Sequence, residues 1–221
     1  MDYFTVLGII ASGTIIRGTP DPASDLDLYV IHQKPFRQRI QKYFNQVPAE
    51  IFINPPKAVE NYFVDEQKNR RPLTAHMLSS GFVVLKLDPI IDELQAKAQE
   101  QLKNPPARPT DLTSPRYLAA LLVEDAVDKI DQDPETAVMI LNKSLDAMFN
   151  FYFVKTGNFI PRQKSLLDEL EQRNPTIAKR ARQFFQATIP EEKMNIALKI
   201  ADETIGVHGF FEWDSGPEEY K

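Results

Sequence analysis

A chain of 221 residues with 43% hydrophobic and 26% charged side chains can bury one large core or two small ones. Its formal net charge of −5 argues against a protein that grips nucleic acid through a broad basic surface. The absence of cysteine excludes disulfides and thiolate metal sites, and three scattered histidines do not suit a zinc cluster, so any metal would need oxygen ligands. No apolar run reaches the roughly 20 residues of a membrane helix, and no basic segment precedes the apolar N-terminus. We therefore expect a soluble, cytoplasmic protein without a membrane partner.

The first half of the chain alternates strand-like and helix-like segments. Short apolar runs bounded by turn residues predict strands at 3–11, 26–32, 47–54 and 81–87. Helical patterns are predicted at 35–46, 71–80 and 88–102. Strands that alternate with helices favour an α/β or α+β domain, which we place at residues 1–105.

A proline-rich segment separates this half from a helical one. Residues 103–115 contain four prolines and no apolar period, which is typical of an inter-domain linker. Apolar residues then recur at helical spacing in the segments 115–130, 134–152, 163–172, 175–186 and 190–206. An all-α helical bundle over residues 112–210 accounts for this pattern. The surface of this bundle is compatible with a homodimer.

Two aspartates stand one residue apart where an apolar strand begins. In the segment SGTIIRGTPDPASDLDLYVIH, strand alternation would place Asp25 and Asp27 on the same side, where their charges repel unless water or a cation intervenes. Carboxylate oxygens are hard ligands that favour Mg²⁺ or Mn²⁺. The aspartates therefore predict a site for a divalent cation.

The turn before these aspartates has the composition of a phosphate-binding loop. Gly13 and Gly18 permit positive φ and close approach of a ligand to backbone N–H groups. Thr14 and Ser24 add hydroxyl donors. Such a loop suits a polyanion, for example the triphosphate of a nucleotide.

A third acid lies in the next predicted strand. Glu50 precedes the apolar run Ile51–Ile53, where an acid is out of place unless it has a function. If this strand pairs with the one that carries Asp27, the three carboxylates would complete the two-metal arrangement used for nucleotidyl transfer. The alternative is that Asp25 and Asp27 are solvated surface acids and that Glu50 marks an edge strand, because edge strands often carry charge.

These residues together resemble the signature of the DNA polymerase β-type nucleotidyltransferase superfamily. The matching residues are Gly13, Thr14, Arg17, Gly18, Ser24, Asp25 and Asp27, with Glu50 as the later acid. Thr14 stands where the family usually has serine, and it keeps the hydroxyl. The resemblance implies a small mixed-sheet nucleotidyltransferase domain in which Asp25, Asp27 and Glu50 are catalytic and hold Mg²⁺ or Mn²⁺. It also implies that Gly13, Thr14, Arg17 and Ser24 bind the nucleoside triphosphate, with ATP as the preferred donor.

The layout of the whole chain is similar to that of kanamycin nucleotidyltransferase-like proteins and of minimal nucleotidyltransferases paired with a HEPN-type bundle. Some of their bundles carry a Pro-x-x-Lys segment whose lysine reaches the nucleotide phosphates, and Pro161 and Lys164 resemble it here. A solvated lysine at a helix start is the alternative for Lys164. The resemblance implies transfer to an acceptor hydroxyl on a small molecule or a protein. The rival function is a catalytically inactive module of the same fold that binds nucleotide or a partner, as in toxin–antitoxin systems.

Overall fold

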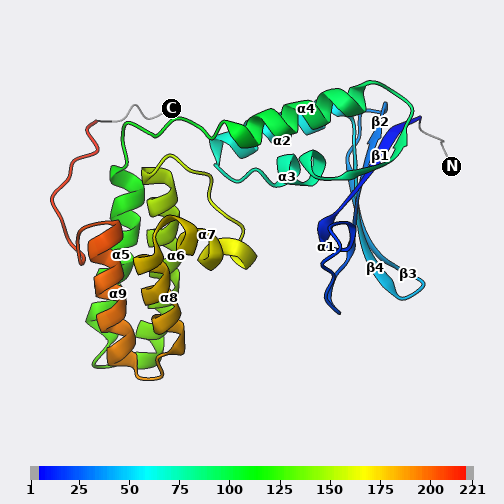
Figure 1. The fold of residues 1–221 in the computed structure, drawn as a ribbon. Coiled ribbons are helices and arrows are strands. Elements are labelled where there is room, and N and C mark those ends of the chain that lie inside the picture. Colours follow the sequence, from blue (N-terminus) through cyan, green and yellow to red (C-terminus); the bar gives the residue numbers. More distant parts are fainter. Residues whose placement is uncertain (1–4, 218–221) are drawn as a thin grey trace. The chain divides into compact units, whose positions relative to one another are not determined.

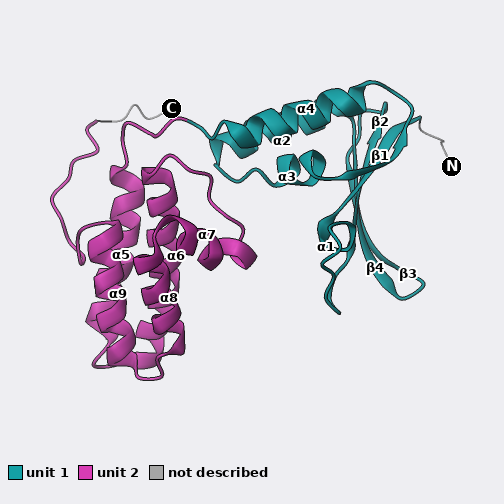
Figure 2. Ribbon diagram, in the orientation of Figure 1, with its two compact units in different colours: residues 1–106 teal, residues 107–221 magenta. Residues whose placement is uncertain are grey.

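The computed structural model describes residues 5–217, so the first residues of the strand predicted at 3–11 lie outside the described part of the chain. Two compact units follow one another, residues 1–106 and 107–221 (Figure 2). The boundary between them falls within the proline-rich segment 103–115.

Unit 1 is built on a mixed sheet. Its strands are β1 (Val6–Ser12), β2 (Leu26–His32), β3 (Gln38–Phe44), β4 (Val47–Asn54) and β5 (Phe82–Lys86). Among the described residues the strand order is β3-β4-β2-β1-β5. β2 and β4 run parallel, whereas the other neighbours are antiparallel. The mixed α+β architecture predicted for this half is therefore confirmed.

Helices α2 (Pro56–Lys68), α3 (Leu73–Ser79) and α4 (Ile90–Lys103) pack on one face of this sheet (Figure 1). From β2, Tyr29 and Ile31 enter the core between sheet and helices and are almost completely buried. They meet Phe63 of α2 and Leu94 of α4 in the same apolar cluster. Because side chains of a strand alternate between faces, Asp27 lies on the same face of the sheet as Tyr29 and Ile31.

The prediction of a helix at 35–46 is wrong, because most of this segment forms the edge strand β3. Asn45 and Gln46 both adopt positive φ, 47° and 68°, and connect β3 to β4 as a two-residue hairpin. Such a turn matches the right-handed twist of paired strands, and asparagine tolerates it better than most residues. Helix α2 was not predicted, although its start at Pro56 and its buried Val59 and Phe63 at i, i+4 spacing are ordinary helix signals.

Unit 2 is a bundle of helices, as predicted. Its elements are α5 (Thr113–Lys129), α6 (Pro134–Lys155), the 3₁₀ turn η1 (Gln163–Ser165), α7 (Leu166–Arg173), α8 (Pro175–Gln186) and α9 (Pro190–Thr204). Asp133 and Asn174 cap α6 and α8, since their side chains accept hydrogen bonds from the N–H groups of Thr136 and Ile177. Within residues 5–217, none of the helices combines the length and apolar character needed to cross a bilayer.

His32 ends β2 as a completely buried imidazole. Its Nδ1 accepts a hydrogen bond from the Lys34 N–H (3.1 Å), and its Nε2 lies 3.2 Å from the Phe36 carbonyl oxygen. This pattern fits the neutral ring with a proton on Nε2. Burial accordingly lowers the pKa of His32 below its ordinary value.

The buried imidazole predicts an acid-sensitive fold. Because the pKa of His32 is lower in the folded chain, the unfolded chain binds more protons as the pH falls below about 6.5, and folding loses stability there. We expect a His32→Gln variant to lose less stability than the wild type between about pH 7.5 and pH 5. Urea unfolding of both proteins across this range measures the difference, in which contributions of the other histidines cancel. Parallel curves would contradict the prediction.

Candidate active site

The pairing of β2 with β4 brings the three predicted acids together. Asp27 and Glu50 are directly opposite each other in the parallel register, and Asp25 lies just before β2. One carboxylate oxygen of each residue lies within 4.8 Å of the other two. All three side chains are half-buried, so the cluster stays accessible from solvent.

The donor set of this cluster fits a divalent cation. Three carboxylates at such distances repel one another, and hard oxygen ligands are what Mg²⁺ and Mn²⁺ prefer. Ser12 is paired with Asp27 across β1 and β2, and among the described residues its buried hydroxyl has no hydrogen-bond partner. An unpaired buried hydroxyl beside clustered acids is a further polar atom that a hydrated cation could satisfy. Ser12 was missed as a site residue, because a serine that ends a strand gives no signal by itself.

The loop between β1 and β2 passes close to these acids. Gly13 opens the short helix α1 (Gly13–Ile16) with a φ of +91°, and a Cβ added there would lie 2.7 Å from Oδ2 of Asp27. The hydroxyls of Thr14 and Ser24, ten positions apart in the sequence, are hydrogen-bonded to each other at 2.8 Å and so close the loop. Arg17 ends α1 as an exposed side chain. The structure therefore brings Gly13 to the acids and ties Thr14 to Ser24.

Replacing Gly13 with alanine is expected to disturb both the fold and the acid cluster. The positive φ costs an alanine about 1–3 kcal/mol of stability, and the new methyl would displace the Asp27 carboxylate. Gly18→Ala is the matched control, because its φ of +75° is also positive whereas no atom lies within 4 Å of the added Cβ. Thermal unfolding with and without Mg²⁺ should show that only Gly13→Ala loses stabilisation by the ion. Equal Mg²⁺ responses of the two variants would contradict this prediction.

Comparison with known proteins gives a match in structure. No family model and no curated protein matches the sequence. The structure is similar to that of a nucleotidyltransferase-like protein from Exiguobacterium sibiricum 255-15, with a TM-score of 0.54 and 16% sequence identity. The match covers 90% of this chain and 68% of that chain. The chain shares the fold of that nucleotidyltransferase-like protein. At this identity the likeness concerns the fold, and it confirms the predicted order of a mixed-sheet domain and a helical region.

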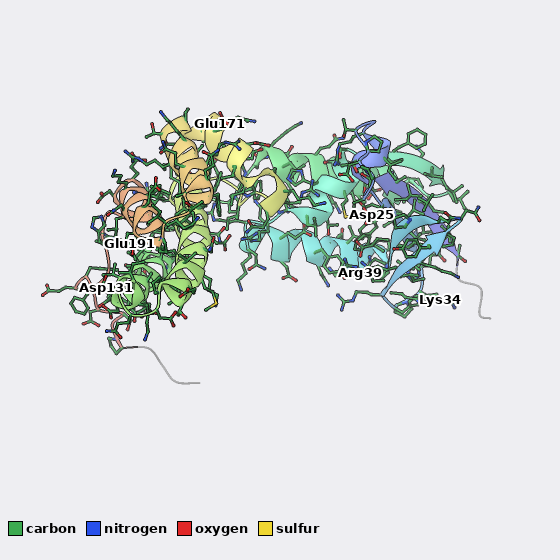
Figure 3. All side chains as sticks on the ribbon, turned by 90° about the horizontal axis from the view of Figure 1, so that it is seen from below. Asp25, Lys34, Arg39, Asp131, Glu171 and Glu191 are labelled. Carbon is green, nitrogen blue, oxygen red and sulfur yellow. The ribbon has the colours of Figure 1, made fainter. Side chains whose placement is uncertain are left out.

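Two side chains of β3 that were not predicted as site residues contact Glu50, the third acid of the cluster. On β3, Arg39 donates through Nε to Oε1 of Glu50, and Gln41 donates through Nε2 to the same oxygen at 3.0 Å. The Glu50 carboxylate raises the pKa of Arg39 by this hydrogen bond and by its charge. Figure 3 labels Arg39 and Asp25, which both belong to unit 1. Both contacts were missed because residues 35–46 were predicted to be helical.

Lys164 belongs to the other unit. It lies in η1, exposed to solvent, and its neighbour Gln163 donates a hydrogen bond to Asp146 at 2.6 Å. The acid cluster lies wholly in unit 1. A contact of Lys164 with nucleotide phosphates therefore stays a prediction from the sequence.

Proposed function

We propose that the protein is a Mg²⁺-dependent nucleotidyltransferase that moves a nucleoside monophosphate from a triphosphate, with ATP as the preferred donor, to an acceptor hydroxyl. The observation that carries this proposal is the meeting of Asp25, Asp27 and Glu50 on two paired strands beside a positive-φ glycine. The nucleotidyltransferase fold supports it.

Asp25 and Asp27 would hold the divalent cations, and Glu50 would share one of them. Bound there, two such ions would make the acceptor hydroxyl more acidic and neutralise the charge of the leaving pyrophosphate. The backbone at Gly13 and the hydroxyls of Thr14 and Ser24 would hold the β- and γ-phosphates, with Arg17 beside them.

The Glu50 carboxylate is the group that would accept the proton of the acceptor hydroxyl. The acceptor oxygen then forms a bond to the α-phosphorus, while the bond from this phosphorus to the β-phosphate bridging oxygen breaks. Pyrophosphate carries away the bonding electron pair. Arg39 and Gln41 both bond Oε1 of Glu50, so this oxygen accepts the proton only if one of these donors leaves, whereas Oε2 carries neither bond.

A labelled-nucleotide screen tests the proposal. The wild-type protein is incubated with Mg²⁺, cell extract and each of the four α-³²P-labelled triphosphates in turn, and label in a new product identifies both the nucleotide and the acceptor class. We expect transfer from ATP to a small-molecule or protein hydroxyl. Failure to label any product with all four nucleotides would argue against catalysis.

One observation favours the second candidate, a nucleotide- or partner-binding module without turnover. Arg39 and Gln41 both bond Oε1 of Glu50, one of the two carboxylate oxygens that catalysis would use. In that case ATP and Mg²⁺ would bind and Asp25→Asn/Asp27→Asn would abolish this binding, yet no pyrophosphate would be released. Isothermal titration together with a pyrophosphate assay separates the two candidates.

A further inference from the structure

A cavity of about 440 Å³ in unit 1 is lined in part by Arg39, the side chain that contacts Glu50. Its floor is the same face of the sheet, because Tyr29 follows Asp27 by two residues on β2 and Phe52 follows Glu50 by two residues on β4. Helices α2 and α3 contribute the opposite wall, with Tyr62 among its residues. A molecule in this cavity would therefore be next to Glu50.

Two arginines from the β3 side line this cavity. Arg37 donates through Nη1 to the Tyr62 hydroxyl at 2.8 Å, and its guanidinium lies 5.6 Å from the centre of that ring. Arg39 lies 5.0 Å from the centre of the Phe52 ring while it contacts Glu50. Within the described chain, each guanidinium keeps N–H groups that no other residue bonds. These N–H groups are donors suited to a phosphate or carboxylate.

The charge of this region differs from that of the whole chain. Residues 34–42 contain four basic side chains and no acidic one, in a protein whose net charge is −5. Figure 3 labels two of them, Lys34 and Arg39. A positive segment in an acidic protein would attract an anion to this cavity.

The acid in the cavity wall, Glu66, already has hydrogen-bond donors from the backbone. Glu66 accepts hydrogen bonds from the backbone N–H groups of Thr74, at 2.7 and 2.9 Å, and of Ala75 at 3.4 Å. Burial raises the pKa of Glu66. The buried Tyr29 hydroxyl, which has Asn54 and Thr74 nearby, forms no hydrogen bond of ordinary geometry among the described residues. Besides the arginines, the wall therefore offers the Tyr29 hydroxyl to a ligand, and its carboxylate is already hydrogen-bonded.

We propose that this cavity binds the acceptor and selects one that carries an anionic group, a phosphate or a carboxylate, held by Arg37 and Arg39. The assignment rests on the proposed function, since the acceptor hydroxyl would point at Glu50. An anion that draws the Arg39 guanidinium away from Glu50 would leave Gln41 as the donor to that carboxylate oxygen, so acceptor binding and preparation of the site would coincide. A polycationic amino sugar would instead meet two positive charges.

The test measures binding without metal or nucleotide, so its outcome does not depend on catalysis. Ribose 5-phosphate, gluconate, ribose and glucosamine are titrated into the full chain by isothermal calorimetry. We expect saturable binding of at least one of the two anions, and much weaker binding of ribose and glucosamine. The Arg37→Gln/Arg39→Gln variant should bind the anion about tenfold or more weakly than the wild type does, as expected for loss of charge-assisted hydrogen bonds. Whether phosphate or carboxylate is the preferred group follows from which anion loses more affinity.

Lys42→Gln is the matched control. It removes one positive charge from the same strand, but Lys42 pairs with Ala49 and so lies on the opposite face from Gln41 and Glu50. Equal weakening by Lys42→Gln and by the double variant would overturn the proposal, as would binding of neither anion or preference for glucosamine. Asp25→Asn/Asp27→Asn should keep anion binding while it loses nucleotide transfer. The failure of this proposal is thereby distinguishable from failure of the proposed function.

Discussion

The Asp25→Asn/Asp27→Asn variant is expected to lose Mg²⁺-dependent nucleotide transfer by about a thousandfold or more, because it removes two of the three carboxylates that could hold the cations. Charge stabilisation by bound metal contributes several kcal/mol to such a transition state, and each 1.36 kcal/mol corresponds to about a tenfold change in rate. The rate of pyrophosphate release with ATP, Mg²⁺ and acceptor gives the measurement.

The same variant has a second readout that needs no acceptor. Three carboxylates with oxygens within 4.8 Å repel one another without a cation, so removing two charges should stabilise the metal-free protein, by about 1 kcal/mol at this half-exposed site. Mg²⁺ should raise the melting temperature of the wild type and not that of the variant. Asp65→Asn, an exposed acid of α2, serves as the control and should behave as the wild type does. If the variant responded to Mg²⁺ as the wild type does, the cation would bind elsewhere.

The Glu50→Gln variant is expected to lower the turnover number by about 10²- to 10⁴-fold, the range for loss of a general base. Asp25 and Asp27 remain, so ATP binding in the presence of Mg²⁺ should fall much less than turnover. Single-turnover rates and ATP titrations, performed on the same samples, measure the two quantities.

The control must distinguish loss of the Glu50 carboxylate from loss of its ion pair with Arg39. Glu60→Gln breaks another partly exposed ion pair of unit 1, the one with Lys97 at 2.6 Å, and should leave turnover within about twofold because such pairs contribute little. Should Glu50→Gln turn over at the wild-type rate, Glu50 would have no part in catalysis.

The acid cluster could be predicted because its signals are local. The spacing of Asp25 and Asp27 places them side by side on any strand, and an acid before the apolar run at 51–53 is conspicuous in the sequence. The sequence alone does not establish that Glu50 faces Asp27. That depends on the register of two parallel strands whose connection includes the whole hairpin of β3.

The cavity and the partners of Glu50 could not be predicted because β3 was missed. Its exposed residues show no apolar alternation, since an edge strand buries little, and the hairpin turn at Asn45 and Gln46 lacks the glycine that usually marks such a turn. A helix placed at 35–46 left Arg39 and Gln41 without a relation to the acids. Because the hairpin turn was not recognised in the sequence, the arginines beside the acid cluster were not predicted.

The parallel register of β2 and β4 fixes both the position of Glu50 opposite Asp27 and the packing of the apolar core. Tyr29 and Phe52, stacked at 5.7 Å between ring centres, come two pairs further along the same ladder than Asp27 and Glu50, on the same face of the sheet. A single inserted or deleted residue in β4 would shift the pairing by one and turn Glu50 to the other face together with Phe52. Loss of the site through such a length change would thus disturb the packing beneath the helices as well. Point substitutions of the acids leave this packing untouched, so a chain that lost its activity by substitution could keep its fold intact.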